Sequence, residues 1–242
     1  MFNTILVHPL FNLLALIYAV VPGHDFGLAV IVLTALVRFA LWPVITKQLH
    51  SQRAMQELAP EVAKVRVKAK GDKTLESKLL MELYKEKEIS PFASLIPLIV
   101  QLPLLLALFV VLKDIIKPGE IAHLVYSPLR NFSAIKAVLD NSQAFKPTLF
   151  GIINLAKPNL VLALIAAGTQ YFQAKQLMPK NADRSTQAVN SATTIIFPIL
   201  TGLIALSLPA ALPLYWIVTS GIALVQQRMI LQRDVVEMEA TK

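Results

Sequence analysis

Arg38 and Thr34 are the residues of this 242-residue chain whose types and spacing most strongly suggest chemistry, because both lie in an otherwise apolar run, Leu28 to Ile45. An arginine at the centre of a membrane-spanning helix costs about 2.5 to 3.5 kcal/mol on insertion scales, so it should face protein or water rather than lipid. A spacing of four places both side chains on one face of a helix. The pair predicts a hydrated, positively charged recess. The alternative is that Arg38 only ties helices together by bonding their backbone carbonyls.

Uncharged polar residues recur at a similar depth in the other long apolar stretches. They are Gln101, Thr169, Gln170, Thr193, Thr194, Thr219 and Ser220. Gln101 and Gln170 carry most weight, because a primary amide in lipid leaves several hydrogen bonds unmade, whereas each Thr or Ser alone is more typical of helix packing. Tyr215 and Trp216 form an aromatic pair that suits either such a site or packing at the membrane interface. No acidic residue lies inside these stretches, which argues against a proton-coupled transporter.

Known catalytic and metal-binding signatures are absent from the sequence. There is no HExxH, nucleophile elbow, P-loop or GxGxxG motif, and the four histidines are scattered without ligand spacing. The chain has no cysteine, which excludes disulfides and thiolate metal sites. We therefore predict neither catalytic residues nor a cofactor nor a metal, and a non-enzymatic function.

The composition is that of an integral membrane protein, with 55% hydrophobic residues, 16% charged residues and a mean hydropathy of +0.60. A helix needs roughly 17 to 20 apolar residues to cross about 30 Å of hydrocarbon. Stretches of this length predict an all-α polytopic membrane protein with five spans. The predicted spans are 27–46, 93–112, 159–178, 189–207 and 210–229.

The remaining segments are predicted from charge and periodicity. Residues 47–90 alternate apolar positions at spacings of three and four around Gly71-Asp72, which predicts an antiparallel helical hairpin in water. Residues 1–26 should form an interfacial helix, with a sixth span or a signal sequence as alternatives. Residues 113–158 form an outer loop with a short amphipathic helix near Ala134 to Leu139. Residues 179–188 and 230–242 are a short loop and a tail.

The distribution of Lys and Arg predicts the orientation. The side that holds the hairpin, the 179–188 loop and the tail has 16 basic residues near or outside the membrane, and the opposite side has six. The positive-inside rule then places the hairpin and C-terminus in the cytoplasm and the N-terminus outside. A basic cytoplasmic face next to anionic lipid explains the net charge of +8 without a sequence-specific nucleic-acid partner.

Several stretches together resemble the YidC/Oxa1/Alb3 family of membrane protein insertases. They occur in the family's order and cover most of the chain apart from the outer loop: PLFNLLALIY, GLAVIVLTALVRFALWPVITKQ, MQELAPEVAKV, LLMELYKEKEISPF, LIPLIVQLPLLLALF and LPAALPLYWIVTSGIALVQQ. The chain resembles the compact form of the family, without a large extracytoplasmic domain. Its short tail of mixed charge does not match the basic tail that some members use on ribosomes.

The resemblance implies a five-span insertase core in a bacterial cell membrane, around a groove open to the cytoplasm and to lipid. It implies that Arg38, Thr34, Tyr215 and Trp216 line this groove, together with Gln101 in the "P, apolar, Q-x-P" text and, more weakly, Gln170. The expected partners are nascent membrane proteins, membrane lipids, and a Sec translocon or ribosome. A small-solute channel or carrier is the rival function, although the nearly apolar outer halves of the spans argue against it, and a lipid scramblase is a third.

Overall fold

The structure is a computed structural model that describes residues 2–87, 102–103, 105–107, 109–111, 121–176 and 192–240, and for 231–240 it describes the helix alone. The described part is nearly all α-helical, in agreement with the predicted fold class. The helices are α1 (His8–Val20), α2 (Phe26–Ala40), α3 (Trp42–Glu57), α4 (Ala59–Ala69), α5 (Lys73–Glu86), α7 (Ser133–Asp140), α8 (Leu160–Gln176), α10 (Phe197–Ala205) and α11 (Ala211–Ala240).

Shorter elements join these helices. Two π-helical turns, η1 (Asn3–Val7) and η7 (Ala192–Ile196), lead directly into α1 and α10. The 3-10 turns are η2 (Pro22–His24), η4 (Ile121–His123), η5 (Ser127–Asn131) and η6 (Ser142–Ala144). The strands β1 (Thr148–Leu149) and β2 (Ile153–Asn154) pair antiparallel, with Thr148 opposite Asn154. This hairpin is the one departure from a purely helical fold in the described part.

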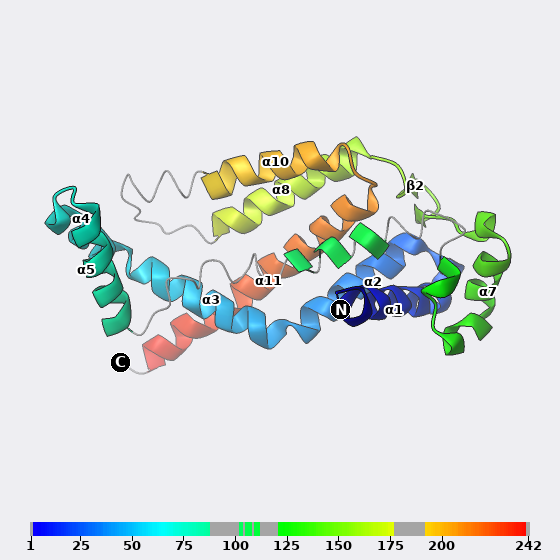
Figure 1. Cartoon of the computed structure of the whole chain (residues 1–242), viewed down its shortest axis with the longest axis horizontal. Helices are drawn as coiled ribbons and strands as arrows, with labels where there is room; N and C mark the ends of the chain where they lie inside the picture. Colours follow the sequence, from blue (N-terminus) through cyan, green and yellow to red (C-terminus); the bar gives the residue numbers. More distant parts are fainter. Residues whose placement is uncertain are drawn as a thin grey trace.

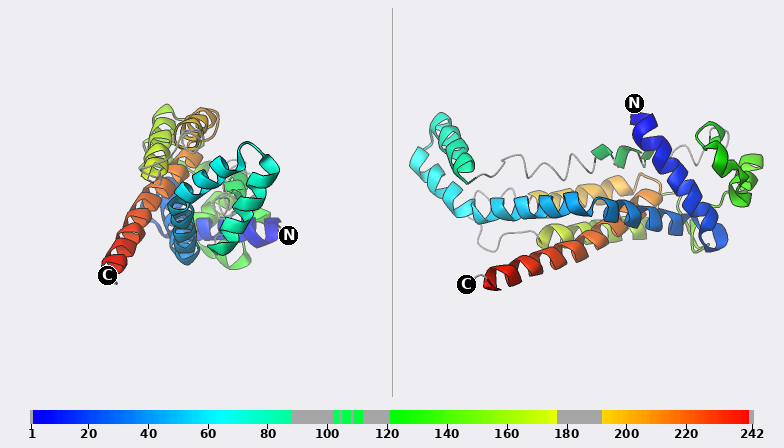
Figure 2. Two further views of the ribbon diagram at one scale, coloured as in Figure 1. Left: turned by 90° about the vertical axis from the view of Figure 1, so that its left-hand side faces the viewer. Right: turned by 90° about the horizontal axis from the view of Figure 1, so that it is seen from below.

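Helix α11 is the central element of the bundle. It packs on α8 and α2, and α10 covers the other side of α8 (Figure 1). Helices α2, α8 and α11 run in one direction along the long axis, toward the end of the molecule that holds α4, α5 and the C-terminus (Figure 2). The opposite end holds α1, α7 and the β-hairpin.

Local sequence explains where the central helices begin and how closely they pack. The Asp25 carboxylate accepts a hydrogen bond from the Leu28 amide at 2.8 Å, and Asn159 does the same for Leu162 at 3.0 Å, so both residues cap the first turn of their helices. Small residues bring α10 and α8 together, because a Cβ atom added to Gly202 would lie 3.1 Å from the Cβ of Ala167.

The segment 27–46, which the sequence predicts as a single span with a proline at position 43, is bent in the structure. It belongs to α2 and α3, which meet at Leu41 with a bend of 65°. Pro43 explains the break, because it has no N–H for the carbonyl four residues earlier and its ring clashes with that carbonyl. Arg38 is therefore in the last turn of α2, directly before the bend.

One other segment differs in extent from its sequence-based limits. The expected tail, 230–242, continues α11 as helix up to Ala240 instead of forming a separate segment. At 1.5 Å per residue, a helix of 30 residues is about 45 Å long, more than the roughly 30 Å of a hydrocarbon core. The segments 93–112 and 179–188 lie largely or wholly outside the described residues.

By length and composition, one helix of the described part could cross a membrane by itself, the continuous η1–α1 segment Asn3–Val20. The pair α2–α3 passes the same test if the bent pair counts as one span, and Thr194–Ala205 is apolar but shorter. Figure 2 shows α1 inclined to the direction of α2 and α11. The five-span arrangement therefore remains a prediction at this stage.

Candidate functional site

Arg38 is a partly buried cation in the last turn of α2 and faces the central helix. Its guanidinium interacts electrostatically with Tyr215 of α11, whose side chain is almost fully buried. Among the described residues, no carboxylate forms an ion pair with Arg38. The guanidinium has five N–H donors, and no carboxylate of the described part pairs with them.

Thr34 lies one turn before Arg38 and is buried. Its hydroxyl donates a hydrogen bond of 2.6 Å to the carbonyl of Val30 within the same helix. The hydroxyl proton is thus already used by the backbone, and only the oxygen's acceptor capacity remains for another group. Thr34 shares the face of Arg38, as predicted, but offers less polar capacity than its type suggests.

Buried polar residues follow two rows along α11. Tyr215, Thr219 and Gln226 are spaced by four and seven residues, which places them on one face of the helix. Trp216, Ser220 and Gln227 repeat the same spacing on an adjoining face. All are buried except Trp216, which is partly buried and packs against the apolar core. The rows begin with the two aromatic residues that the sequence analysis selected.

Of the two glutamines predicted as site residues, the structure describes Gln170 but not Gln101. Gln170 is a partly buried residue of α8, and its Oε1 is buried without a hydrogen-bond partner in the described part. Farther along α8, Gln176 donates a bond of 3.4 Å to the carbonyl of Leu224 on α11. Gln101 lies outside the described residues. Among the predicted site residues on different helices, Arg38 and Tyr215 are thus the pair with an electrostatic interaction in the described part.

Unpaired polar atoms gather on α11 and its neighbours. Within the described ranges, the buried side-chain atoms without a hydrogen-bond partner are Gln52 Oε1, Gln170 Oε1, Thr194 Oγ1, Thr219 Oγ1, Gln226 Oε1, Gln226 Nε2 and Gln227 Oε1. Each such group costs about 1 to 3 kcal/mol when it is left unmatched. Groups of this kind can bind polar or charged ligands. No cluster of three or more His, Asp or Glu that could hold a metal occurs in the described part.

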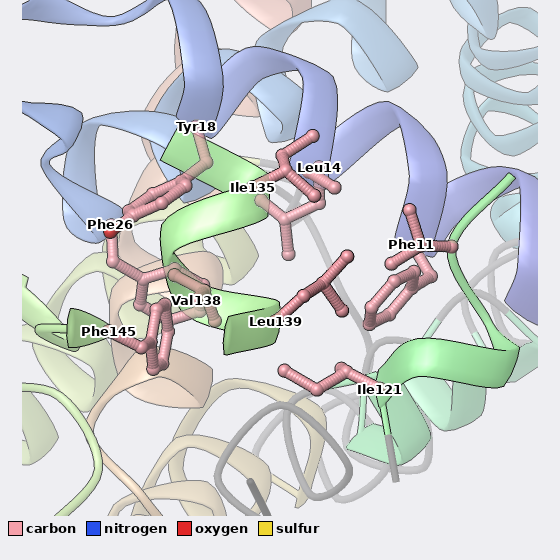
Figure 3. A pocket seen from close by; sticks show the side chains of 11 residues that line it. Phe11, Leu14, Tyr18, Phe26, Ile121, Ile135, Val138, Leu139 and Phe145 are labelled. Carbon is pink, nitrogen blue, oxygen red and sulfur yellow. The ribbon is translucent and has the colours of Figure 1, made fainter. Parts of the chain in front are cut away.

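A separate apolar pocket lies at the other end of the molecule, between α1, α7 and the turns that flank α7 (Figure 3). It encloses about 40 Å³, and residues such as Phe11, Leu14, Phe26, Val138 and Phe145 line it. Tyr18 and Phe26 both pack edge-on against Phe145 there. The pocket contains none of the predicted polar site residues.

Comparison with known proteins decides the family. The model of the 60Kd inner membrane protein family matches residues 16–237, which is most of the chain. The chain belongs to this family. It is 30% identical to "Membrane protein insertase YidC 2" of Bacillus anthracis over 94% of this chain and 80% of that protein. It is 29% identical to "Membrane protein insertase YidC" of Fusobacterium nucleatum, over 86% of this chain and 87% of the relative.

A third relative is longer than this chain. The "Membrane protein insertase YidC" of Streptomyces avermitilis is 28% identical over 88% of this chain, which spans 52% of that relative. The match to the family extends from α1 through α11 and includes Arg38 and the two rows on α11. The matching family is described as an inner membrane protein family, and the relatives are named membrane protein insertases.

Sequence reasoning did not select Gln52, Gln226 and Gln227. The two neighbouring glutamines stand at the end of the apolar run of α11, where polar residues are expected to reach water. Helical spacing could have indicated both glutamines, because Gln226 shares a helical face with Tyr215 and Gln227 shares one with Trp216. That the two glutamines are buried, however, is known only from the packing of α11 in the structure.

Proposed function

We propose that this chain inserts newly made membrane proteins into the bacterial inner membrane and helps them fold, through polar groups placed between α2, α8 and α11. The supporting relatives are all named membrane protein insertases, and they match most of the chain. Their names do not favour a solute channel, a carrier or a lipid scramblase. The observation that carries the mechanism is Arg38, a cation without an acidic partner in the described part, beside buried Tyr215.

The distribution of apolar side chains supports a membrane setting for these helices. Large apolar residues are exposed along α8 and α10, including Leu164, Phe172, Phe197 and Leu203, each 57 to 63% exposed. Polar residues such as Ser220 and Gln226 are buried between the helices. This arrangement, apolar outside and polar inside, suits lipid on the outer surface and hydrated clients at the centre. We propose the five-span topology with the N-terminus outside and the C-terminus in the cytoplasm on this basis.

Charge and hydration explain how the site lowers the barrier to insertion. A polar client tail that enters between the helices to the depth of Arg38 stays solvated and has a shorter path through hydrocarbon. The guanidinium attracts acidic groups of that tail, and a low dielectric strengthens the attraction. The apolar segment of the client then moves into lipid, driven by about 25 cal/mol per Å² of apolar surface removed from water. No step in this mechanism consumes a nucleotide.

The other proposed groove residues assist this step. Tyr215 and Trp216 present amphipathic rings at the end of the two polar rows nearest Arg38, and Gln170 and Gln101 supply amide groups from neighbouring spans. Thr34 contributes an acceptor oxygen. We propose that the protein works alone or with a Sec translocon, and that ribosomes bring nascent clients to it.

Insertion into liposomes tests the proposal. A single-span client with an acidic N-terminal tail is added to liposomes with or without the purified protein, and tail translocation is scored by protease protection. We expect protection only when the protein is present, without nucleotide. Solute leakage or lipid flipping by the same liposomes in the absence of any protected client would instead favour the channel or scramblase function.

A further inference from the structure

Two buried side-chain amides in the described part have opposite hydrogen bonding. Asn12 of α1 is 4% exposed, and its amide donates to the carbonyls of His8 and Leu124, each at 2.8 Å, and accepts from the Tyr126 amide at 2.7 Å. Gln226 of α11 is 1% exposed, and neither its Oε1 nor its Nε2 has a partner within the described residues. The first amide is a structural tie. The unpaired amide of Gln226 lowers the stability of the protein, because a buried leucine or methionine at this position would leave no polar group unmatched.

The position of Gln226 follows from the contacts of its row on α11. Tyr215 meets Arg38 at the end of α2, and Ile230 packs against Ile45 and Leu49 of α3. Gln226 lies on the same face, one turn before Ile230 and about 16 Å along the helix from Tyr215. Since Leu41 also packs against the Ile230 cluster, Gln226 faces the bend between α2 and α3.

Gln226 is next in sequence to a second buried acceptor on α11. The Oε1 atom of Gln227 also lacks a partner within the described residues. A ligand for this region must therefore supply N–H donors, and it must also accept a bond from Gln226 Nε2. A peptide backbone offers both groups at every residue, whereas a lipid tail offers neither.

Among the side chains that the structure describes, the contact of α11 with α3 is smaller than its contacts with α2 and α8. This described contact, which on α11 extends to Ile230, involves Ile230 with Ile45 and Leu49. Both helices run toward the end of the molecule that carries α4 and α5 (Figure 2). Separation of α3 from α11 would expose Gln226 on the route from that end to Arg38.

We propose that Gln226 binds the main chain of a client polypeptide at the bend between α2 and α3, with its primary amide paired to a client peptide group. This inference rests on the proposed insertase function. It assigns to Gln226 a role that does not depend on client side chains, because the peptide group is common to all clients. Arg38, in contrast, selects for acidic groups.

Synthetic clients whose translocated tail carries either ordinary or N-methylated peptide groups test this pairing. N-methylation removes the backbone N–H and leaves the side chains unchanged. Liposomes hold the wild-type protein or Gln226→Met, which keeps the shape of the side chain and removes both hydrogen-bonding groups. Initial insertion rates are corrected for those of protein-free liposomes, and thermal unfolding of both proteins is measured in detergent.

We expect Gln226→Met to unfold at the same or a higher temperature and to insert the ordinary client more slowly. We also expect N-methylation to slow the wild-type protein about two- to twelvefold more than the variant, the ratio that one hydrogen bond of about 0.5 to 1.5 kcal/mol provides. Equal sensitivity of both proteins to N-methylation would overturn the role of Gln226 and leave the insertase function intact. A variant that is slower only because it is less stable would also overturn it. Failure of the wild-type protein with both clients would contradict the proposed function itself.

Discussion

At the scale of single residues, the polar groups of this protein differ in whether a partner already occupies them. Thr34 uses its hydroxyl proton on its own helix, and the Asn12 amide bonds to His8 in its own helix and to Leu124 and Tyr126. Arg38 has no ion pair with a carboxylate of the described residues, and Gln226 has no hydrogen-bond partner there. Residue type alone does not separate these cases. The residues available to bind a client are the buried polar residues without a partner, whose burial lowers the stability of the protein.

The charge of Arg38 should matter in proportion to the charge of the client. We expect Arg38→Ala to slow insertion of a client with an acidic tail about tenfold, equivalent to roughly 1.4 kcal/mol, and Arg38→Lys to slow it less, because the lysine keeps the charge. A client with the same tail in amide form, Asn and Gln for Asp and Glu, should respond weakly to either variant. The measurement is the initial rate of protease protection. Equal loss for both clients would assign Arg38 a structural role.

Gly27 should be essential for packing at the outer end. A Cβ atom there would lie 2.8 Å from the Cα of Leu149 in β1, too close for the backbone to accept without a shift. We expect Gly27→Ala to reduce stability by about 1 to 3 kcal/mol, as overpacked sites do. The matched control is Gly168→Ala in α8, because an added Cβ there would have no atom of the described residues within 4 Å. Thermal unfolding in detergent should show a lower midpoint for the first variant and an unchanged or higher one for the second.

At the scale of elements, one side chain connects α1 to the outer loop. The amide of Asn12 bridges α1 to the carbonyl of Leu124 and the N–H of Tyr126, more than a hundred residues away in the sequence. Apolar residues of α1, α7 and the turns before α7 belong to one core cluster, and several of them line the pocket in Figure 3. A polar residue that interrupts an apolar stretch thus holds two segments together instead of lining a site.

Loss of this link should loosen the outer loop. We expect Asn12→Leu to leave the Leu124 carbonyl and the Tyr126 N–H unmatched and to cost about 1 to 3 kcal/mol for each buried group. Hydrogen exchange of the segment 121–131 should therefore accelerate. Asn141→Ala is the control, because the Asn141 side chain accepts only a local, exposed bond from the Gln143 amide at 3.0 Å. Similar exchange in both variants would show that the bridge adds no stability.

At the scale of the whole molecule, the two ends have different chemical character. One end carries α4 and α5, where the pairs Arg66–Glu76 and Lys87–Glu61, each 3.3 Å apart, link the two helices. The other end carries α1, α7 and the β-hairpin (Figure 1). The excess of Lys and Arg on the α4–α5 side supports its proposed cytoplasmic location. Exposed surface pairs of this kind contribute little stability each, so they indicate an aqueous setting more than a strong joint.

The orientation can be measured directly, because the chain has no cysteine. We expect a single cysteine at Gly71, between α4 and α5, to be protected from a membrane-impermeant thiol reagent in intact cells. A single cysteine at Asn141, after α7, should be labelled. Both should react after the membrane is dissolved. The reverse pattern would contradict the proposed topology.

The sequence by itself determined the membrane class, the helical content, the family and the choice of Arg38, since mean hydropathy, apolar run length and the position of one charge are local properties of the chain. Pro43 already indicates a bend near Leu41, but tertiary structure decided its angle of 65°, the position of Arg38 relative to Tyr215 and the difference between Asn12 and Gln226. These features depend on which atoms of distant segments come within hydrogen-bonding or packing distance. Gln226, for example, is buried because α11 packs between α2 and α8, and its lack of a hydrogen-bond partner among the described residues follows from the same packing.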